Sequence, residues 1–332
     1  MRRIPRPTVT SRLSAVGIAG LVALDVALVA MAVNYTAPTP ASAGGPVIAS
    51  TTALSTPAPS GQSGSASSPT TSSASSTSPT SSTTPVQPAP LRMALVAVNG
   101  AVAWRTTRGS CPDGGGSVSV TSDGGKTWTP RAVGAQAVMR VRPTSTTAAS
   151  VVSASRDCEP QVRTTSDSGA TWTQAGGTNT TWFRDLQDNR LVHSPGLQAV
   201  RPCDEAAVLD LAPVGSSGAW ALCGDGRLRA SEDSGASWNT PGTVSGAVAL
   251  DARADKTGST AYVLRVADEC DGLQIVRVGG GRAAASALGC VEVSAGIESG
   301  TITLSVAGSD GWVGIGERVW RSRDGMQTWS PA

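Results

Sequence analysis

The chain has 332 residues, with 26 Lys or Arg, 24 Asp or Glu and a single His. Residues 1–33 hold four of the arginines and one of the acids, so the rest of the chain carries 22 basic and 23 acidic residues. This near-neutral balance excludes the basic surface that nucleic-acid binding requires. Any histidine-dependent site would have to use His193.

Residues 13–33, LSAVGIAGLVALDVALVAMAV, form an apolar run that contains one charge. As a helix this run would be about 30 Å long, which is enough to cross the hydrocarbon core of a bilayer. The basic tail at 1–12 resists translocation, so we expect it in the cytoplasm and the C-terminal part outside. The sequence therefore predicts a single-pass transmembrane signal-anchor in the cell membrane. A cleaved leader ending near Ala41–Ala43 is the alternative, although that site lies well past the apolar run.

Asp25 is the one charged residue of the apolar run. A carboxylate at mid-membrane costs about 2.5–3.5 kcal/mol on insertion scales. Two interpretations stay open. The apolar neighbours tolerate the charge, or Asp25 hydrogen-bonds another membrane helix, which would then be a partner of this chain.

Residues 34–91 are rich in Ser, Thr, Pro and Ala, and no charged residue occurs from Tyr35 to Leu91. Such a segment has too little apolar surface to offset its chain entropy, so we expect a disordered linker. As a flexible coil it would span roughly 40 Å. Residues 92–332 remain for one globular domain, which is long enough for a substantial core.

Six cysteines follow the linker, and none lies in a metal-binding spacing. An even number outside the cytoplasm predicts three disulfides, for which sequence alone permits fifteen pairings. The equal twenty-residue spacings favour Cys203–Cys223 and Cys270–Cys290, which leaves Cys111–Cys158 by elimination.

An eight-residue string recurs in the globular part. It reads TSDGGKTW at Thr121–Trp128, TSDSGATW at Thr165–Trp172, SEDSGASW at Ser231–Trp238 and SRDGMQTW at Ser322–Trp329. Short runs rich in Val, Thr, Ile and Trp precede each copy, and helical periodicity is nearly absent. Four strands in a unit of about forty residues predict a propeller blade.

Each residue type in the string has a physical role in a tight turn. The Asp can accept hydrogen bonds from the backbone amides of the turn, and the Gly supplies a positive φ. The hydroxyl side chains can hydrogen-bond locally, and the Trp has a large area to bury. We therefore expect the string to fasten the outer hairpin of each blade.

The pattern S/T-x-D-x-G-x-S/T-W resembles the Asp-box, or BNR, repeat. The resemblance implies an all-β fold, a β-propeller of four-stranded antiparallel blades, with the aspartates on its periphery in a structural role. The fourth copy departs from the pattern because Met326 replaces the Gly, which leaves a different turn open there. The structural residues that the resemblance assigns are Asp123, Gly125, Trp128, Asp167, Gly169, Trp172, Asp233, Gly235, Trp238, Asp324 and Trp329.

The spacing of the repeats favours six blades, with five as the alternative. The long interval before Asp324 predicts one blade without the string, near Gln274–Arg282. The interval before Asp233 holds extra residues at Thr178–Pro202, which are either a shortened blade or a long insertion.

The Asp-box family includes sialidases, which resemble one another in an arginine triad, an acidic Asp and a Tyr nucleophile paired with Glu. Outside the linker this chain has only Tyr262, which is typical of an ordinary strand residue, with Glu269 as the nearest suitable acid. The Arg-Ile-Pro motif of that family occurs only at Arg3–Pro5, before the apolar run. The sequence therefore disfavours sialidase activity.

Other residues also favour structural interpretations. The acid pairs Asp204/Glu205 and Asp268/Glu269 are expected to be solvated loop charges, and His193 structural or exposed. Trp104, Trp220 and Trp312 are expected in the core, on the second strands of their blades.

No catalytic, cofactor or metal site is predicted. The remaining similar proteins are photosystem assembly factors and sorting-receptor ectodomains, so the resemblance implies a binding or scaffold module. We expect its partner to be a protein or a cell-envelope polymer. A sialidase-like glycoside hydrolase is the alternative function, and a structural envelope component without a specific ligand is the third.

Overall fold

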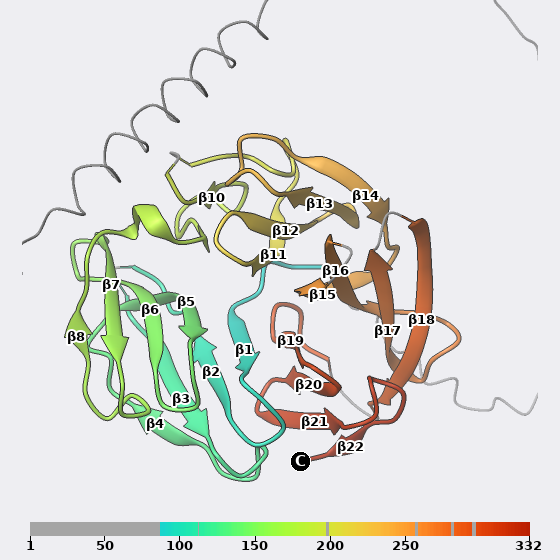
Figure 1. Cartoon of the computed structure of the whole chain (residues 1–332), viewed down its shortest axis with the longest axis horizontal. Coiled ribbons are helices and arrows are strands. Elements are labelled where there is room, and N and C mark those ends of the chain that lie inside the picture. The colour runs from blue at the N-terminus through green and yellow to red at the C-terminus, as the bar shows by residue number, and fades with distance from the viewer. Residues whose placement is uncertain (1–86, 112, 197–198, 256–257, 280–281, 294–296) are drawn as a thin grey trace, which may run out of the picture. The chain divides into compact units, whose positions relative to one another are not determined.

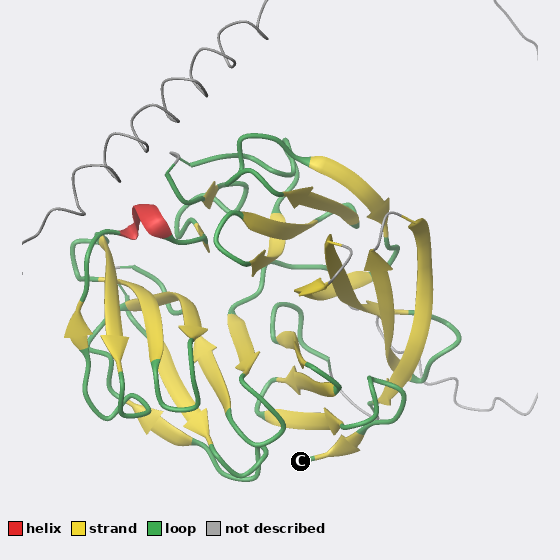
Figure 2. Ribbon diagram, viewed as in Figure 1, coloured by secondary structure: helices red, strands yellow, loops and turns green. Residues whose placement is uncertain are grey.

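The computed structural model describes residues 87–332 except 112, 197–198, 256–257, 280–281 and 294–296. These residues form five four-stranded antiparallel sheets and one two-stranded sheet, arranged radially around a common centre (Figure 1). Apart from one short 3-10 turn, the described secondary structure is all strand (Figure 2). The predicted all-β propeller is confirmed.

Within each four-stranded blade the strands lie side by side in chain order, with the first nearest the centre of the ring and the fourth at the outer edge. The first blade holds β1 (Met93–Ala97), β2 (Ala103–Thr107), β3 (Ser117–Thr121) and β4 (Thr129–Arg131), and the second β5 (Ala137–Pro143), β6 (Ala149–Ala154), β7 (Pro160–Thr165) and β8 (Thr173–Gln174). The two-stranded sheet holds β9 (Phe183–Arg184) and β10 (Val192–His193), after the 3-10 turn η1 (Thr178–Thr180). The next blade holds β11 (Val208–Val214), β12 (Gly218–Cys223), β13 (Arg227–Ser231) and β14 (Asn239–Thr243). The last two hold β15 (Ala247–Asp255), β16 (Gly258–Val266), β17 (Gly272–Gly279) and β18 (Arg282–Glu292), then β19 (Ile302–Ala307), β20 (Asp310–Ile315), β21 (Arg318–Ser322) and β22 (Ser330–Pro331).

The structure has five complete blades, the alternative count, rather than the six that the spacing favoured. The extra residues at Thr178–Pro202 supply only β9 and β10, and β9 contacts both β5 and β11. A shortened, two-stranded blade therefore lies in the ring between the blade of β5–β8 and the blade of β11–β14. The predicted blade without the repeated string is confirmed as β15–β18, which contains Gln274.

The repeated string forms the same turn between the third and fourth strands of four blades. In the first copy, the Thr121 hydroxyl donates to Asp123 Oδ1 at 2.8 Å and accepts from the Gly125 amide at 3.0 Å. The Thr127 amide donates to Asp123 Oδ1 at 3.0 Å, and the Thr127 hydroxyl donates to Oδ2 at 2.6 Å. The copies at Asp167 and Asp233 make the same hydrogen bonds. Each aspartate therefore organises its own turn. We call these segments the aspartate turns.

The fourth turn keeps this arrangement although it lacks the expected glycine. The Met326 amide donates to the Ser322 hydroxyl at 3.0 Å, and the Thr328 amide and hydroxyl bond Asp324. Met326 has a φ of 68°, within the left-handed region that Gly125 adopts at 96°. The Met326 side chain is buried in an apolar cluster, and this packing compensates for the unfavourable backbone conformation.

The aspartate turns also pack on the preceding blade. The ring of Trp172 meets Trp104 of the first blade edge-on at 6.1 Å, and Trp238 meets Trp182 beside the two-stranded sheet at 5.8 Å. Trp128 packs against the cluster that contains Trp312 of the last blade. The tryptophans therefore join neighbouring blades, whereas the sequence predicted only packing within one blade.

The second-strand tryptophans Trp104, Trp220 and Trp312 lie on β2, β12 and β20 and are buried, as predicted. Trp312 also closes the ring, because its Nε1 donates to the carbonyl of Asn99 in the first blade at 3.1 Å. Arg321 stacks on the Trp312 ring at 3.7 Å and donates to the carbonyl of Gly124. The first and last blades are therefore joined by side chains rather than by a shared strand.

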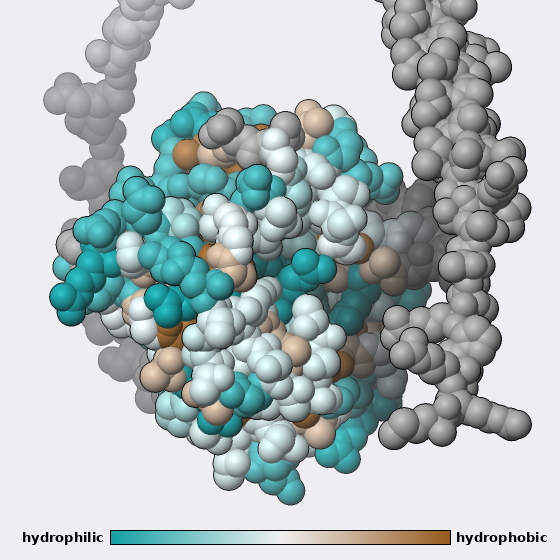
Figure 3. All heavy atoms as spheres, turned by 60° about the vertical axis from the view of Figure 1, so that its left-hand side comes forward, coloured by the Kyte–Doolittle hydropathy of each residue, from teal (hydrophilic) through white to brown (hydrophobic). Residues whose placement is uncertain are grey.

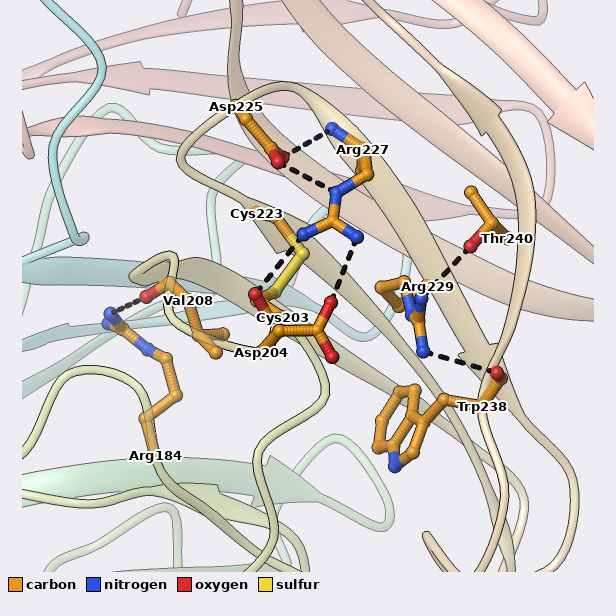
Figure 4. The surroundings of a disulfide bond; sticks show 10 residues. All are labelled: Arg184, Cys203, Asp204, Val208, Cys223, Asp225, Arg227, Arg229, Trp238 and Thr240. Atoms are coloured by element: carbon orange, nitrogen blue, oxygen red, sulfur yellow. Dashed lines mark hydrogen bonds and ion pairs between the residues drawn. A yellow bond between two sulfur atoms is a disulfide. The ribbon is translucent and has the colours of Figure 1, made fainter. Parts of the chain in front are cut away.

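The three predicted disulfides, Cys111–Cys158, Cys203–Cys223 and Cys270–Cys290, are confirmed. Cys111 follows β2 and Cys158 follows β6, so the first bond joins two blades. Cys203–Cys223 ties the segment after β10 to the end of β12 (Figure 4). The first bond thus crosses a boundary between blades, and the second ties the connection after β10 to the blade that holds β12.

The predicted cytoplasmic tail (1–12), the membrane segment (13–33) with Asp25, and residues 34–86 of the predicted linker (34–91) lie outside the described residues. The end of that linker is described, and Leu91 is buried and hydrogen-bonded to Leu209, so the folded domain begins before residue 92. Within the described part of the chain, no helix combines the length and apolar character needed to span a bilayer.

We expect Cys270→Ser/Cys290→Ser to lower the free energy of unfolding by about 3 kcal/mol, because a twenty-residue loop loses its closure. Cys111→Ser/Cys158→Ser, which opens a 47-residue loop, should cost about 4 kcal/mol. Chemical denaturation followed by tryptophan fluorescence measures both values. Free thiols in the native wild-type protein would contradict the pairing.

We expect Asp233→Asn to reduce the acid sensitivity of the fold. Hydrogen bonds from the Ser237 side chain, the Ser237 amide and the Ser231 side chain lower the pKa of Asp233 to about 2. This group therefore stabilises the fold above about pH 4, the range of a free carboxyl, and the stabilisation is lost as the pH falls towards 2. Melting temperatures between pH 2 and 7 should show a smaller drop in the variant and a lower value at pH 7.

The neighbouring exposed residue supplies the control for this measurement. Glu232→Gln removes an exposed carboxyl that lies within the same turn but makes none of its hydrogen bonds, and it should leave the melting curve close to that of the wild-type protein. Equal acid sensitivity of Asp233→Asn and the wild-type protein would contradict the role of the aspartate turn.

Candidate functional site

The inner strands enclose a central channel of about 340 Å³. The strands β1, β5, β9, β11, β15 and β19 each contribute to its wall. Five charged side chains lie along the wall among apolar residues of the inner strands: Arg140, Arg184, Asp210, Asp251 and Arg253. None of the aspartate-turn residues lies on this wall, because the turns follow the third strands of the blades.

The channel aspartates join each blade to the next. Asp210 on β11 accepts from its neighbour Leu211 at 2.8 Å and from the Leu250 amide on β15 at 2.9 Å. Asp251 on β15 likewise accepts from the Ala252 amide at 2.9 Å and from the Val306 amide on β19 at 2.7 Å.

A serine continues the same series across the next boundary. The Ser305 hydroxyl on β19 accepts from the Ala97 amide on β1 at 3.0 Å. Three consecutive blade boundaries, between β11 and β1, are therefore bridged by a side chain of one inner strand and an amide of the next. We call Asp210, Asp251 and Ser305 the inner belt.

Arginines bridge the other part of the ring. Arg140 on β5 donates from Nη1 to the Leu211 carbonyl on β11 at 3.4 Å, and Arg184 on β9 donates from Nη1 to the Val208 carbonyl at 3.3 Å (Figure 4). A one-residue bulge at Met139 comes directly before Arg140 and a similar bulge at Leu209 comes before Asp210. Bulges re-aim side chains, and these two orient charged residues towards the centre.

Burial dominates the electrostatics of the channel. It raises the pKa values of Asp210 and Asp251 above those of ordinary carboxyls, although Arg184 and Arg253 respectively oppose the shift. Burial also lowers the pKa of Arg140 to about 10, against the opposing fields of Asp251 and Asp210. The raised carboxyl pKa values favour the folded state at low pH, and this contribution is lost as the pH rises through them.

A second, larger cavity lies at one mouth of the channel. This mouth pocket has a volume of about 680 Å³ and is lined by Pro90–Arg92, Arg108 and the segment Arg184–Arg190. Leu91 and Arg184 line both the channel and the mouth pocket. The two cavities therefore adjoin.

The segment before β1 forms one wall of the mouth pocket. The Leu91 amide donates to the Leu209 carbonyl at 2.9 Å, and the Arg92 amide donates to the Gly300 carbonyl at 2.8 Å. Leu91 is only 4% exposed. Figure 1 shows this segment crossing the centre of the ring beside β11. The start of the described chain is thus built into the mouth.

His193 lies on β10 close to the mouth pocket. Its Nε2 is 2.8 Å from Asp185 Oδ2, and its ring stacks on Phe183 at 4.4 Å. Partial burial alone would raise the pKa of Asp185, but hydrogen bonds from His193 and from the amides of Asp188 and Gln187 lower it. The histidine thus has a structural partner, and the Asp185 carboxylate also accepts hydrogen bonds from the amides of Gln187 and Asp188.

Tyr262 and Glu269 do not lie on either cavity. Tyr262 is on β16, where it packs partly buried against an apolar cluster. Glu269, whose side chain is mostly exposed, lies 3.8 Å from Arg265 in an ion pair. Tyr262 and Glu269, the pair that a sialidase-like reaction would use, therefore do not lie at the channel.

The paired acids Asp204 and Glu205 form ion pairs on the surface. Arg227 bridges Asp204 at 3.0 Å and Asp225 at 2.7 Å, beside the Cys203–Cys223 disulfide (Figure 4). Glu205 pairs with Arg190 at 3.1 Å. These contacts support the reading of the acids as loop charges.

The described surface offers little apolar area. Val266, at 36%, is the one large hydrophobic side chain there that counts as exposed. On the face shown in Figure 3, hydrophilic and near-neutral residues predominate and apolar ones are scattered. In the described part of the chain no three His, Cys, Asp or Glu side chains gather as metal ligands would. Recognition through the mouth pocket fits this surface better than docking on an apolar patch.

Sequence reasoning missed the inner belt and the mouth pocket. The belt had a local signal, since Asp210 and Asp251 each interrupt an apolar strand, in VLDLAP and VALDAR. The mouth pocket had none, because Leu91, Arg108 and Arg184 are far apart in the chain.

No protein-family model matches the chain, and no curated protein matches it. Three solved structures illustrate the similarities found. YCF48 from Cyanidioschyzon merolae is 14% identical, with 74% of this chain and 87% of that chain covered and a TM-score of 0.39. The Aleuria aurantia lectin in complex with Fucα1-6GlcNAc is 13% identical, with 73% and 94% covered and a TM-score of 0.44. A nidogen/laminin complex chain is 10% identical, with 71% and 90% covered and a TM-score of 0.43. These similarities assign no activity to the chain.

We expect Asp251→Ala to destabilise the protein by about 2–4 kcal/mol, because the Ala252 and Val306 amides lose their acceptor. The two amides bond different oxygens of Asp251, so Asp251→Asn keeps one acceptor and turns an NH2 group towards the other amide; it should cost at least half as much as Asp251→Ala. Urea denaturation measures both, and Asp271→Ala, an exposed acid in the same blade, serves as the control. Equal stability of Asp251→Ala and the wild-type protein would contradict the bridging role.

Proposed function

We propose that this protein is a membrane-tethered, extracytoplasmic propeller that acts by binding a protein or a cell-envelope polymer. The observation that carries the proposal is the mouth pocket, a polar cavity of about 680 Å³ at one end of the ring. Its volume falls within the range of ligand-binding clefts. The walls come from three separate parts of the chain, so the closed ring itself forms the cavity.

The charged residues of the channel support binding over catalysis. Both belt aspartates accept two backbone amides each, and the arginines donate to carbonyls. A general acid or a nucleophile needs an available side chain within reach of a substrate. In the channel these groups hold the blades together instead.

The cellular placement rests on the sequence. The apolar run at 13–33 with basic residues before it supports a single-pass anchor whose C-terminal part lies outside the cytoplasm. Three disulfides in the folded part are consistent with an oxidising compartment. We infer that residues 34–86 form a linker that holds the propeller away from the membrane surface, and that the family assignment is an Asp-box propeller.

We expect purified full-length protein, immobilised in detergent micelles, to retain a partner from purified cell-wall polymer or from an extracytoplasmic protein fraction. Gln187→Trp places a bulky side chain at an exposed position that lines the mouth pocket and should lower retention at least tenfold. Gln174→Trp, at an exposed position on β8, is the matched control and should retain the partner as the wild-type protein does.

Two outcomes would overturn the proposal. Product release from a panel of glycosides, abolished by a single carboxylate substitution, would replace binding with hydrolysis. Equal retention by Gln187→Trp and Gln174→Trp would show that any binding uses another surface.

A further inference from the structure

Two arginines of the mouth pocket lack an acidic partner. Arg108 follows β2 and Arg184 lies on β9. Within the described residues, no carboxylate oxygen lies within 4 Å of either guanidinium. The other two arginines of the pocket are different, because Arg92 pairs with Glu298 and Arg190 pairs with Asp188.

Backbone carbonyls supply the hydrogen bonds of these two side chains. Arg108 Nη2 donates to the Arg184 carbonyl at 3.1 Å and also to the Asp185 carbonyl, whereas Arg184 donates to the Val208 and Leu91 carbonyls. Arg108 Nη1 is buried and has no hydrogen-bond partner. A buried, charged donor without a partner is costly, and among the described arginines that line the mouth pocket Arg108 is the one with such a nitrogen.

The nearby aspartates do not complete it. The Asp185 carboxylate is bonded to His193 Nε2 and to the amides of Gln187 and Asp188. The Asp210 carboxylate is bonded to the amides of Leu211 and Leu250. Burial and the field of Arg184 lower the pKa of Arg108 to about 9, so it remains protonated at neutral pH.

The balance of charges indicates the charge of the missing group. Along the channel and its mouth, outside the ion pairs at the rim, the cations are Arg108, Arg140, Arg184 and Arg253, and the anions are Asp185, Asp210 and Asp251. The excess is one positive charge. A singly charged anion neutralises this excess, whereas a doubly charged one would overcompensate it in a poorly solvated site.

We propose that the mouth pocket binds a carboxylate group between the guanidinium groups of Arg108 and Arg184. Guanidinium groups match the geometry of carboxylates and form short, charge-assisted hydrogen bonds with them. The inference deepens the proposed binding function and rests on it, because it names the acidic group through which a partner would engage the pocket. In this proposal the carboxylate accepts from the Arg108 guanidinium, whose Nη1 has no partner and would become accessible through a small movement of the side chain.

Sodium acetate serves as the probe, with full-length protein in detergent micelles at pH 7 and ionic strength held constant with sodium chloride. Isothermal titration calorimetry should show saturable acetate binding to the wild-type protein. We expect Arg108→Gln to weaken this binding at least tenfold. Arg277→Gln, which removes an exposed arginine on β17, is the matched control and should leave the affinity unchanged.

A second variant keeps the test valid if Arg108→Gln does not fold, since Arg108 also holds two carbonyls. Arg108→Lys retains the charge but has one donor nitrogen in place of the planar fork, so we expect several-fold weaker acetate binding with a native tryptophan fluorescence spectrum. Affinity equal to the wild-type value in either folded variant would overturn the proposal.

Two further results bear on the identity of the ligand. Absence of saturable acetate binding to the wild-type protein would overturn the proposal, as would tighter binding of inorganic phosphate than of acetate. Retention of a polymer or protein partner is measured separately. Failure to retain a partner, with acetate still bound, would therefore refute the binding function while leaving the carboxylate site in place.

Discussion

Neighbouring blades are held together at the centre of the ring by hydrogen bonds. In each, a backbone amide of one inner strand donates to a side chain of the preceding inner strand, and the arrangement of the blades depends on these bonds. A radial ring of sheets has to hold each blade against the next at its narrowest point, where little apolar surface is available. Asp210, Asp251 and Ser305 meet that need at three consecutive boundaries. Because Leu250, Val306 and Ala97 are buried, losing these acceptors would leave buried donors unpaired.

Because the channel acids are hydrogen-bonded in this way, they are not available for binding or chemistry at the centre of the ring. Carboxylates that each accept two amides are poor candidates for a reaction, and Tyr262 packs partly buried against an apolar cluster away from the channel. The mouth differs from the channel because two of its arginines have no acid partner. In the centre of the ring the charged side chains are therefore used to hold the blades together, whereas at the mouth two arginines have no acidic partner. Binding at the mouth follows from this contrast.

Sequence reasoning succeeded where interactions are local. An aspartate turn lies within eight residues, so its hydrogen bonds could be predicted from residue types and spacing alone. Equal spacing indicated two of the disulfides, and burial of Trp104, Trp220 and Trp312 followed from their place on second strands. The Met326 turn was less predictable, because its strained backbone depends on packing in a distant apolar cluster.

Interactions between distant segments could not be predicted in this way. The other five blades leave room in the ring for only the short sheet of β9 and β10. The spacing of the repeats in the sequence gives only an approximate measure of that room. The mouth pocket depends on the segment at Leu91 pairing with β11 after the ring has closed. Its arginines belong to different blades, and nothing in their local sequences distinguishes them from surface arginines.

Native-state hydrogen exchange of the amides of Leu250, Val306 and Ala97 tests most directly whether side chains of the inner belt hold the ring together. If they do, these three amides exchange only through global unfolding, with the same protection as the central residues of β12 and β16. Rapid exchange of these amides, while β12 and β16 stay protected, would show that the blades are joined in some other way.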